Sequence, residues 1–119
     1  DNVVDRYINK KLMFPGGNTV NFSAFAKQCG ADAAYLVVIA NDREGQLIHN
    51  SLTELGVDLS HSPLQGGLAT ERCDVVLEDG DRVFVGCSYG EGKAETLKLT
   101  EEHIEYLKTL DIIHSSCYS

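Results

Sequence analysis

The feature that most constrains this chain is an uninterrupted apolar run, AYLVVIA, at residues 34–40. A β-branched run without polar alternation is typical of a strand buried on both faces, as in a parallel sheet covered by helices. Asn41 and Asp42 follow at once and can cap a helix over residues 43–55, which Gly56 ends. The sequence therefore predicts an α/β fold.

The segment before that run predicts a turn followed by a helix. Residues 14–18 read FPGGN, a cluster of turn formers, and residues 19–28 carry apolar side chains at helical spacing. Asn18 is a good N-cap, and Gly30 ends the helix. A glycine pair before a helix lets a ligand approach backbone N–H groups at its positive end. Residues 16–21, GGNTVN, are thus a candidate site for hydroxyls or anions, with a plain turn and N-cap as the alternative.

The second half of the chain predicts a hairpin, a helix and a last strand. Residues 70–77 and 82–85 alternate partly between apolar and polar side chains, and the tight Asp-Gly turn in residues 78–81 joins them. Thr100 can cap a helix that runs to residue 110, and its first turn holds two glutamates. A strand is expected from Asp111 onward.

The length fits one domain and the ends look cut. The chain has 119 residues, which is enough for one compact domain and too few for two. It opens on Asp1 without Met and closes on an apolar run at residues 112–113 followed by small polar residues. A parallel strand without its following helix leaves a packing face uncovered. We therefore expect residues 1–119 to be truncated at both ends.

Charge and hydropathy exclude several classes of protein. The formal net charge is −8, without a clustered basic stripe, which argues against DNA or RNA binding. The sequence has neither an apolar run of membrane-spanning length nor the pattern of a signal peptide. We therefore expect a cytoplasmic protein without a membrane partner.

The cysteines and histidines lack metal-ligand spacing. The cysteines stand far apart, at Cys29, Cys73, Cys87 and Cys117, without a C-x-x-C pair. Small buried thiols are the expected state, and two disulfides in a secreted protein are the alternative. The histidines are expected to be structural or exposed, and the sequence predicts no metal site.

Several motifs together carry a family resemblance. FPGGNTVN, ANDREG and LGVD occur in that order at residues 14–21, 40–45 and 55–58. In this order they resemble the first half of the PfkB, or ribokinase-like, sugar kinases. DNVVD, DRVF and DIIH, at residues 1–5, 81–84 and 111–114, resemble the fructoselysine 6-kinase branch of that family. The resemblance implies a ribokinase-like parallel sheet with flanking helices, a β-hairpin lid at about residues 66–90, and residues 1–119 as the N-terminal part of one domain.

The chain departs from the family pattern in three ways. Thr19 stands where Gly, Ala or Pro is common, and Ala40 replaces the Gly of a Gly-Asn-Asp turn. The family's Gly-Ala-Gly-Asp segment, which stabilises the transferring phosphoryl group and takes the substrate proton, is absent. Residues 41–44 spell the family's Asn-x-x-Glu magnesium motif in the wrong place, and we interpret them as helix capping. We therefore expect no catalytic residue in this chain, with ATP and Mg²⁺ bound mainly by a missing C-terminal half.

The resemblance also implies which residues bind the sugar. Asp5 matches the acidic residue after the first strand that accepts hydrogen bonds from sugar hydroxyls. Gly16, Gly17 and Asn18 match the point where the helix start meets the sugar, and Asn21 can both donate to and accept from hydroxyls. The alternatives are an ordinary turn residue at Asp5, a plain cap at Asn18 and a surface side chain at Asn21.

Residues of the predicted lid are further candidates for substrate recognition and for dimer contacts. Arg82 or Tyr89 could meet the group that distinguishes the substrate, since a fructosamine's amino-acid carboxylate suits Arg. The alternative is a solvated charge and a loop aromatic. Tyr118 falls near a position where some relatives place a sugar-contacting side chain. The lid in such kinases often pairs with a second subunit, so a homodimer through the hairpin is expected.

These observations predict the acceptor-binding part of an ATP-dependent kinase. By resemblance, the parent protein phosphorylates a hydroxyl of a small-molecule sugar, the 6-hydroxyl of a fructosamine such as fructoselysine. This chain alone is expected to be inactive. The alternative is a non-catalytic sugar-binding or dimerisation module that uses the glycine turn as an effector site.

Overall fold

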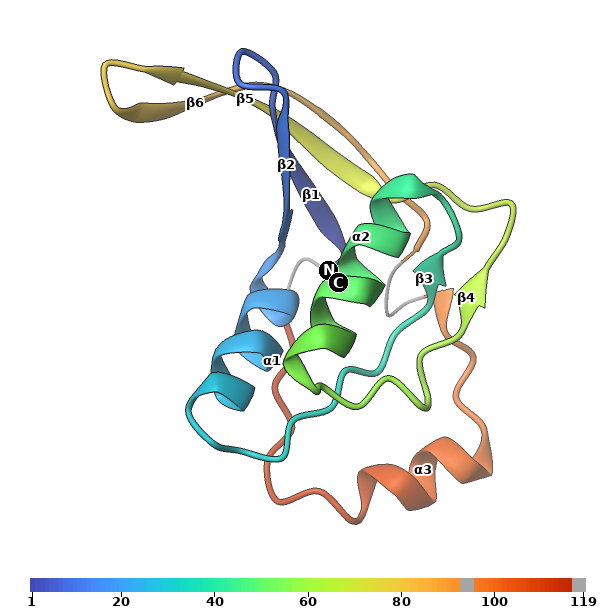
Figure 1. The fold of residues 1–119 in the computed structure, drawn as a ribbon. Helices are drawn as coiled ribbons and strands as arrows, with labels where there is room; N and C mark the ends of the chain where they lie inside the picture. The colour runs from blue at the N-terminus through green and yellow to red at the C-terminus, as the bar shows by residue number, and fades with distance from the viewer. Residues whose placement is uncertain (93–95, 117–119) are drawn as a thin grey trace.

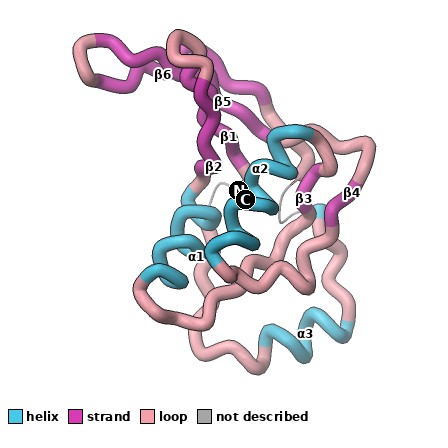
Figure 2. Tube along the Cα trace, in the orientation of Figure 1, coloured by secondary structure: helices cyan, strands magenta, loops and turns pink. Residues whose placement is uncertain are grey.

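The computed structural model of the chain describes residues 1–92 and 96–116. Figure 1 shows an arm of long β-strands that projects from a body containing two packed helices. Coloured by secondary structure, the chain in Figure 2 is mostly helix and loop in the body, with the long strands in the arm. The elements, in chain order, are β1 (Val3–Tyr7), β2 (Leu12–Gly16), α1 (Asn18–Gln28), β3 (Ile39–Ala40), α2 (Arg43–Leu55), β4 (Leu64–Gln65), β5 (Glu71–Glu78), β6 (Asp81–Ser88) and α3 (Glu101–Leu107).

The arm is a four-stranded mixed sheet in the order β2-β1-β5-β6. β1 and β5 run parallel, whereas β2 and β6 are antiparallel to their neighbours. A second sheet pairs β3 and β4 in parallel. The α/β fold predicted from the sequence is confirmed, and the sheet that contains the predicted hairpin is mixed.

The hairpin β5–β6 forms where the sequence predicts it. Asp79 and Gly80 have φ angles of 51° and 90°. Positive φ at both corner residues matches a tight turn whose twist fits the flanking strands, which is why an Asp-Gly pair stands there. The sheet is nevertheless wider than the predicted hairpin, because β1 and β2 also belong to it.

Two local predictions around the first helix are wrong. Residues 14–16 were expected in a turn but lie in β2, where Pro15 is tolerated because β2 is an edge strand of the sheet. The N-cap of α1 is Gly17, which makes no side-chain cap, and Asn18 is already the first helical residue. The capping group comes from Asp1, whose carboxylate accepts hydrogen bonds from the backbone N–H groups of Asn18 and Thr19.

The apolar run at residues 34–40 is buried as predicted, but little of it is strand. Val37, Val38 and Ile39 are at most 2% exposed, while only Ile39–Ala40 form a strand. Earlier in the run, backbone pairing is limited to an isolated parallel bridge between Ala34 and Asp58. The Val37 N–H donates to the Ser62 side chain, so a hydroxyl replaces part of the expected ladder.

The end of the described chain also differs from the prediction. α3 begins after its Thr100 cap as expected, but it ends at Leu107 rather than at residue 110. Residues 111–116 contain no strand where one was predicted. Among the described residues, no helix is both long and apolar enough to cross a membrane.

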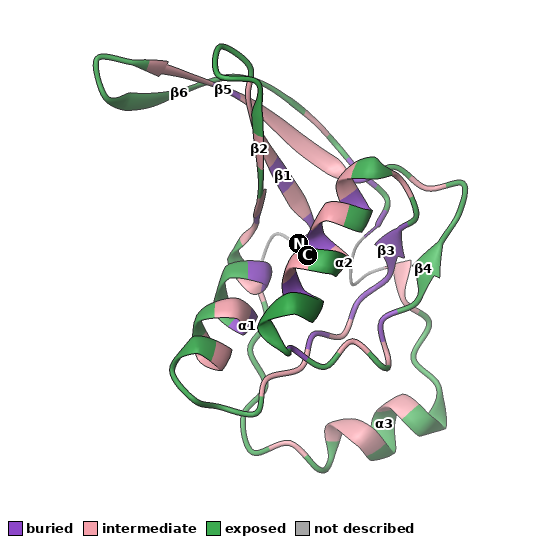
Figure 3. Ribbon diagram, in the orientation of Figure 1, coloured by how far each residue is buried: buried purple, intermediate pink, exposed green. Residues whose placement is uncertain are grey.

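The core lies where α2, β3 and the start of β1 meet. Figure 3 shows the buried residues gathered there, whereas the tip of the hairpin is exposed. Ile48 and Leu52 lie one turn apart on α2 and are 0% and 1% exposed. They pack with buried residues from other elements, namely Val4, Val20, Tyr35, Val37, Ile39 and Val57.

The prediction of small buried thiols is wrong for each cysteine among the described residues. Cys73 on β5 lies directly opposite Cys87 on β6, with their Cα atoms 4.1 Å apart, and the two form a disulfide. Strand pairing brings together residues 14 positions apart, which the spacing in the sequence does not reveal. Cys29 is free but exposed rather than buried. Cys117 lies outside the described residues.

Asp42 joins α2 to the start of β5. Its Oδ1 accepts from the Gly45 N–H at 2.7 Å and the Thr70 hydroxyl at 2.6 Å, and its Oδ2 accepts from the Thr70 N–H at 2.8 Å. Burial works to raise the pKa of Asp42, but these hydrogen bonds together outweigh burial and lower it. The predicted capping role of residues 41–44 is confirmed, since Asp42 is the N-cap of α2.

We predict that Asp42→Ala lowers the free energy of unfolding at pH 7 by about 2 kcal/mol, because an N-cap and two further hydrogen bonds are lost. A carboxyl whose pKa is lowered by folding stabilises the chain above about pH 4, and that contribution disappears as the pH falls through the folded value. Urea denaturation should therefore show wild type and variant converging in acid.

Asp32→Ala is the matched control, because the Asp32 side chain is fully exposed and its nearest cation, Lys27, is 3.6 Å away. It should change the stability by less than about 0.5 kcal/mol. Equal effects of the two substitutions would contradict the assigned role of Asp42.

Candidate functional site

The predicted site residue Asp5 lies in the arm, in the middle of β1 rather than after the first strand as expected. Successive side chains of a strand point to opposite faces, so Asp5 and Tyr7 share one face and Arg6 lies on the other. An Asp5 oxygen lies 3.8 Å from an Arg82 nitrogen of β6, and the Tyr7 ring lies 5.7 Å from the Phe14 ring of β2. We call this surface the Asp5 face, and its residues are Asp5, Tyr7, Phe14, Arg82 and Phe84.

The Asp5 carboxylate is partly buried. Its side chain is 21% exposed. Burial raises the pKa of Asp5, and the positive charge of Arg82 offsets part of this effect. Folding therefore disfavours the charged form of this carboxyl, which is the opposite of what a structural ion pair does. Perturbed carboxyls of this kind are concentrated at functional sites.

Arg82 reaches over the Asp5 face from the edge strand β6. Its guanidinium carbon lies 5.8 Å from the centre of the Phe84 ring, and 56% of its side chain is exposed. A hydrogen bond and the charge interaction with Tyr7 raise the pKa of Arg82, with a smaller contribution from Asp5. The guanidinium thus stays charged, and its exposed part can bind a carboxylate or phosphate group.

The predicted glycines lie beside Asp5 at the end of β2. A Cβ at Gly16 would lie 3.5 Å from the Asp5 carboxyl carbon, so a side chain at this position would cover the carboxylate. Gly17 has a φ of 98°, and a Cβ there would collide with the Asp1 carbonyl oxygen. Glycine is therefore required at position 17, and at position 16 it leaves space above Asp5.

The start of α1 is partly occupied by the chain itself. The Asp1 carboxylate accepts from the backbone N–H groups of Asn18 at 3.0 Å and Thr19 at 3.1 Å. The Asn18 side-chain oxygen lies 2.7 Å from His114 Nε2, whose ring stacks on Phe22. The positive helix end thus stabilises Asp1 in the structure, and Asn18 faces the last described segment of the chain.

The remaining predicted residues lie apart from this cluster. Asn21 is exposed on α1, and among the described residues its side chain makes no hydrogen bond. Tyr89 follows β6 and is 90% exposed. Tyr118 lies outside the described residues. The structure therefore brings together Asp5, Gly16 and Arg82, and it leaves Asn21 and Tyr89 in solvent.

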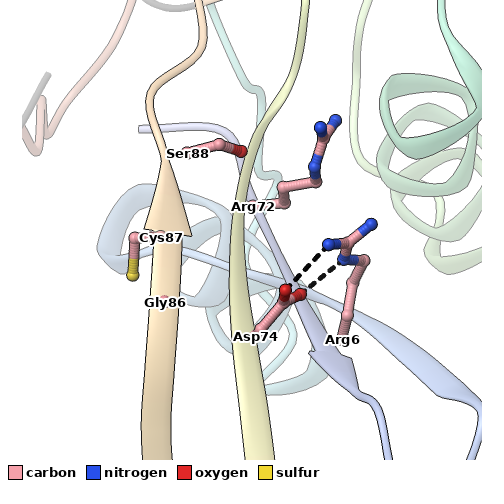
Figure 4. A pocket seen from close by; sticks show the side chains of 6 residues that line it. All are labelled: Arg6, Arg72, Asp74, Gly86, Cys87 and Ser88. Atoms are coloured by element: carbon pink, nitrogen blue, oxygen red, sulfur yellow. Dashed lines mark hydrogen bonds and ion pairs between the residues drawn. The ribbon is translucent and has the colours of Figure 1, made fainter.

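The opposite face of the arm carries a structural ion pair. Figure 4 shows Arg6 donating two hydrogen bonds to Asp74, at 2.7 and 2.9 Å. These bonds lower the pKa of Asp74, in contrast to Asp5. The cavity there is about 190 Å³ and is lined by Arg6, Arg72, Asp74, Gly86, Cys87 and Ser88. Asp74 is already satisfied by Arg6, so we do not assign it a ligand.

A larger cleft of about 910 Å³ lies in the body. Its walls come from α1, residues 31–37 and the segment from α3 to residue 115, and they are mainly apolar. Asp5, Asn18, Asn21 and Arg82 do not line it. No group of three or more His, Cys, Asp or Glu side chains in residues 1–92 and 96–116 could hold a metal ion.

Sequence reasoning missed the aromatic part of the Asp5 face. Phe14 was assigned to a turn, and Tyr7 and Phe84 were not singled out, although β1, β2 and β6 bring them together. The available signal was their alternation with Asp5 and Arg82 along the strands, which places them on the same face once the strands are paired. Asp1 was missed because a capping group 17 residues from its helix leaves no local pattern.

Comparison with protein families gives one match over nearly the whole chain. The model described as pfkB family carbohydrate kinase matches residues 4–117. Fructoselysine 6-kinase of Escherichia coli (strain K12) is 33% identical over 118 residues, which are 99% of this chain and 44% of that enzyme. Fructosamine kinase FrlD of Bacillus subtilis (strain 168) is 32% identical over 124 residues, 100% of this chain and 42% of that enzyme. The chain thus spans less than half of these relatives.

Solved structures confirm the fold class. The apo fructokinase from Vibrio cholerae O395 is 27% identical, with a TM-score of 0.62 over 71% of this chain and 31% of that one. An uncharacterized sugar kinase from Pyrococcus horikoshii in complex with ATP is 16% identical, with a TM-score of 0.57 over 71% of this chain and 30% of that one. The second likeness concerns the fold alone.

We predict that Asp5→Asn leaves the free energy of unfolding at pH 7 unchanged or slightly higher. A carboxyl whose pKa is raised by folding favours the folded state below its unfolded pKa, and this advantage is lost as the pH rises through the folded value. A neutral amide avoids the cost of burying the charge. Urea denaturation at pH 7 and in mild acid measures the difference, which should shrink in acid.

Asp74→Asn is the matched control on the opposite face. It breaks the paired hydrogen bonds with Arg6 and should lower the stability at pH 7 by about 1 kcal/mol, a modest value because both side chains are about one-third exposed. A loss of this size in Asp5→Asn would identify Asp5 as a structural ion-pair partner instead.

Proposed function

The chain belongs to the pfkB family of carbohydrate kinases, and we propose that its protein transfers the γ-phosphoryl group of ATP to the 6-hydroxyl of a fructosamine such as fructoselysine. The bond between the γ-phosphorus and its bridging oxygen breaks, the sugar oxygen bonds to phosphorus, and the hydroxyl proton leaves to a base. The observation that carries this proposal is the partly buried Asp5 carboxylate, which lies 3.8 Å from Arg82. Because Gly16 has no side chain, the carboxylate stays accessible on that side. Similarity to a fructoselysine 6-kinase and a fructosamine kinase supports the substrate class.

We assign Asp5 the task of holding the sugar. A carboxylate accepts hydrogen bonds only, and its two oxygens can take two neighbouring hydroxyls at once. Partial burial strengthens such bonds, because water competes less for the carboxylate. A fixed acceptor of this kind orients the hydroxyl that reacts, and orientation is one of the largest contributions to phosphoryl transfer.

Arg82 distinguishes a fructosamine from a plain ketose in this proposal. Fructoselysine carries an amino-acid carboxylate that fructose lacks, and a guanidinium can hold a carboxylate through two parallel hydrogen bonds. More than half of the Arg82 side chain remains exposed beyond its contact with Asp5. The rings of Tyr7, Phe14 and Phe84 border the same face and can pack against the apolar side of the sugar.

Residues at the start of α1 and in the loop after β6 complete the proposed set of sugar-binding residues. The Asn18 side-chain nitrogen can donate to a hydroxyl while its oxygen contacts His114. Gly17 and Asn21 adjoin it, and Tyr89 is assigned to the distal part of the substrate. Closure of the exposed arm over the sugar brings these residues together in our proposal, since in this structure Asn21 and Tyr89 lie apart from Asp5.

ATP and Mg²⁺ belong to the other part of the protein in this proposal. The Gly-Ala-Gly-Asp segment of the family is absent from the 119 residues. Among the described residues the donor set does not fit a metal ion either, because acidic and histidine side chains do not cluster. In this proposal the 119 residues therefore supply acceptor binding, and the groups that hold ATP and Mg²⁺ are supplied by the other part of the protein.

A second copy of the chain is the proposed partner of the arm. Large apolar side chains on its strands and turns are unusually exposed, among them Ile8 (48%), Leu12 (51%), Phe14 (50%), Phe84 (55%) and Val85 (54%). Exposed apolar side chains in this number favour an interaction site on the arm. Within residues 1–92 and 96–116, neither edge strand of the arm sheet, β2 or β6, pairs with a further strand, so a second arm can cover apolar side chains that the body does not reach.

We predict that fructoselysine shifts the amide NMR signals of Asp5, Gly16 and Gly17 in this chain, and that Asp5→Asn weakens binding at least tenfold. A tenfold loss corresponds to about 1.4 kcal/mol, a reasonable loss for two weakened hydrogen bonds to a charged acceptor. Asp74→Asn, on the opposite face of the same sheet, is the control and should bind normally. Signal shifts confined to the large cleft would overturn the assignment.

Arg82→Gln should remove the preference for the fructosamine. We expect the affinity for fructoselysine to fall about tenfold, while the affinity for fructose changes little, because only the amino-acid carboxylate is lost as a partner. Isothermal titration with both sugars measures the ratio. A similar loss for both sugars would assign Arg82 to positioning Asp5 rather than to recognition.

Phe84→Ser should weaken self-association of the chain about tenfold or more, because a half-exposed aromatic ring is lost from the proposed interface. Sedimentation velocity over a range of concentrations measures this. Phe25→Ser is the control, since Phe25 is 62% exposed on α1, away from the arm. A chain that stays monomeric at all concentrations, or equal effects of both variants, would contradict the arm interface.

A further inference from the structure

We propose that Cys73 and Cys87 form a reversible thiol–disulfide site that fixes the edge strand β6 of the arm. The two residues are directly opposite in the β5–β6 pairing, with Cα atoms 4.1 Å apart. The substrate class of this site is a low-molecular-weight disulfide or thiol of the glutathione type. None of the sugar-binding residues proposed above takes part in this chemistry.

Exposure makes the pair accessible to a small reagent. Cys87 is exposed on β6, whereas Cys73 is only partly exposed on the inner strand β5. Figure 4 shows Cys87 and Ser88 leaving β6 on opposite sides, so the cysteine lies on the face away from the Arg6–Asp74 pair. Exposed disulfides are the ones that exchange readily with thiols. The geometry therefore points to Cys87 as the first sulfur attacked or oxidised.

In the proposed reaction a small-molecule disulfide oxidises the two protein thiols. The Cys87 thiolate attacks one sulfur of oxidised glutathione, forms a mixed disulfide and releases one glutathione thiolate. The Cys73 thiolate then attacks the Cys87 sulfur, and the second glutathione leaves. Two protein thiols lose two electrons and two protons, and one glutathione disulfide becomes two glutathione thiols. Excess glutathione reverses both steps.

The bond matters because β6 is paired on one side only, by β5. β6 is the last strand of the sheet, and its pairing with β5 shifts register at Asp74/Val75, close to Cys73. The pairing places Cys73 opposite Asp5 on β1, and β6 also carries Arg82. The disulfide thus ties the strand bearing Arg82 to the strand beside Asp5. Any effect on sugar binding rests on the proposed function, whereas the thiol chemistry and the strand ordering do not.

The first test uses the chain in a Cys29→Ser, Cys117→Ser background, so that only the pair can react. After equilibration with mixtures of reduced and oxidised glutathione, mass spectrometry should show a Cys73–Cys87 disulfide that appears with the oxidant and disappears with the thiol. Persistence of two free thiols in excess oxidised glutathione would overturn the proposal, as would a bond that thiols cannot reduce in the folded chain.

Single variants in the same background test the order of attack. Cys73→Ser leaves Cys87 without its resolving partner and should accumulate a glutathione mixed disulfide. Cys87→Ser should be modified at least tenfold more slowly, because Cys73 is less accessible. Equal rates would contradict the assigned roles of the two sulfurs, and circular dichroism confirms that both variants are folded.

Hydrogen exchange tests the structural consequence without any sugar. Backbone amides of β6 should exchange at least tenfold more slowly in the oxidised than in the reduced chain, because opening of an edge strand dominates exchange there. Amides of α2, which packs in the core and takes no part in the arm sheet, are the internal control and should not change. Identical exchange of β6 in both forms would show that the disulfide does not hold the strand.

Discussion

The parallel pairing of β1 with β5 is the interaction on which the rest of the structure depends. β1 starts in the core at Val4, which is fully buried, and continues outward into the arm. Because β5 pairs along all of β1, it brings its own partner β6 into the same sheet. A two-stranded hairpin alone would be marginal in water, whereas four strands rooted in a core can project a stable surface. Asp5 and Arg82 face each other only because of this pairing.

Local signals in the sequence were sufficient for the elements whose stabilising contacts are local. Asp42 caps α2 through its own neighbourhood, and the Asp79-Gly80 turn needs only the backbone geometry of two residues. Local signals predicted neither of the first two strands, and the family resemblance implied only a strand before Asp5, because the pairing partners of both strands are not visible locally and Pro15-Gly16 resembles a turn. Strand pairing overrides the turn propensity of Pro15-Gly16, because proline is tolerated in an edge strand of a sheet.

The residues of the candidate site were likewise predictable only in part. Family resemblance pointed to Asp5 and Gly16, and the structure places them on neighbouring strands, but the aromatic residues around them follow only from strand register. Asn18 was expected to cap its helix, and the actual capping carboxylate belongs to Asp1. A helix start satisfied by a distant side chain leaves no trace in the local sequence. Predicting it would have required the tertiary contact itself.

Asp42 and Asp5 show two ways in which the fold treats a carboxyl group. Asp42 accepts three hydrogen bonds, and its pKa is lowered although it is partly buried. Burial raises the pKa of Asp5, and the Arg82 guanidinium at 3.8 Å offsets only part of this effect. In the proposed function the oxygens of Asp5 are therefore available to donors on a ligand, whereas those of Asp42 are taken by the chain itself. A partly buried acceptor bordered by exposed aromatic rings is the physical reason for proposing that the arm binds a polyhydroxylated molecule.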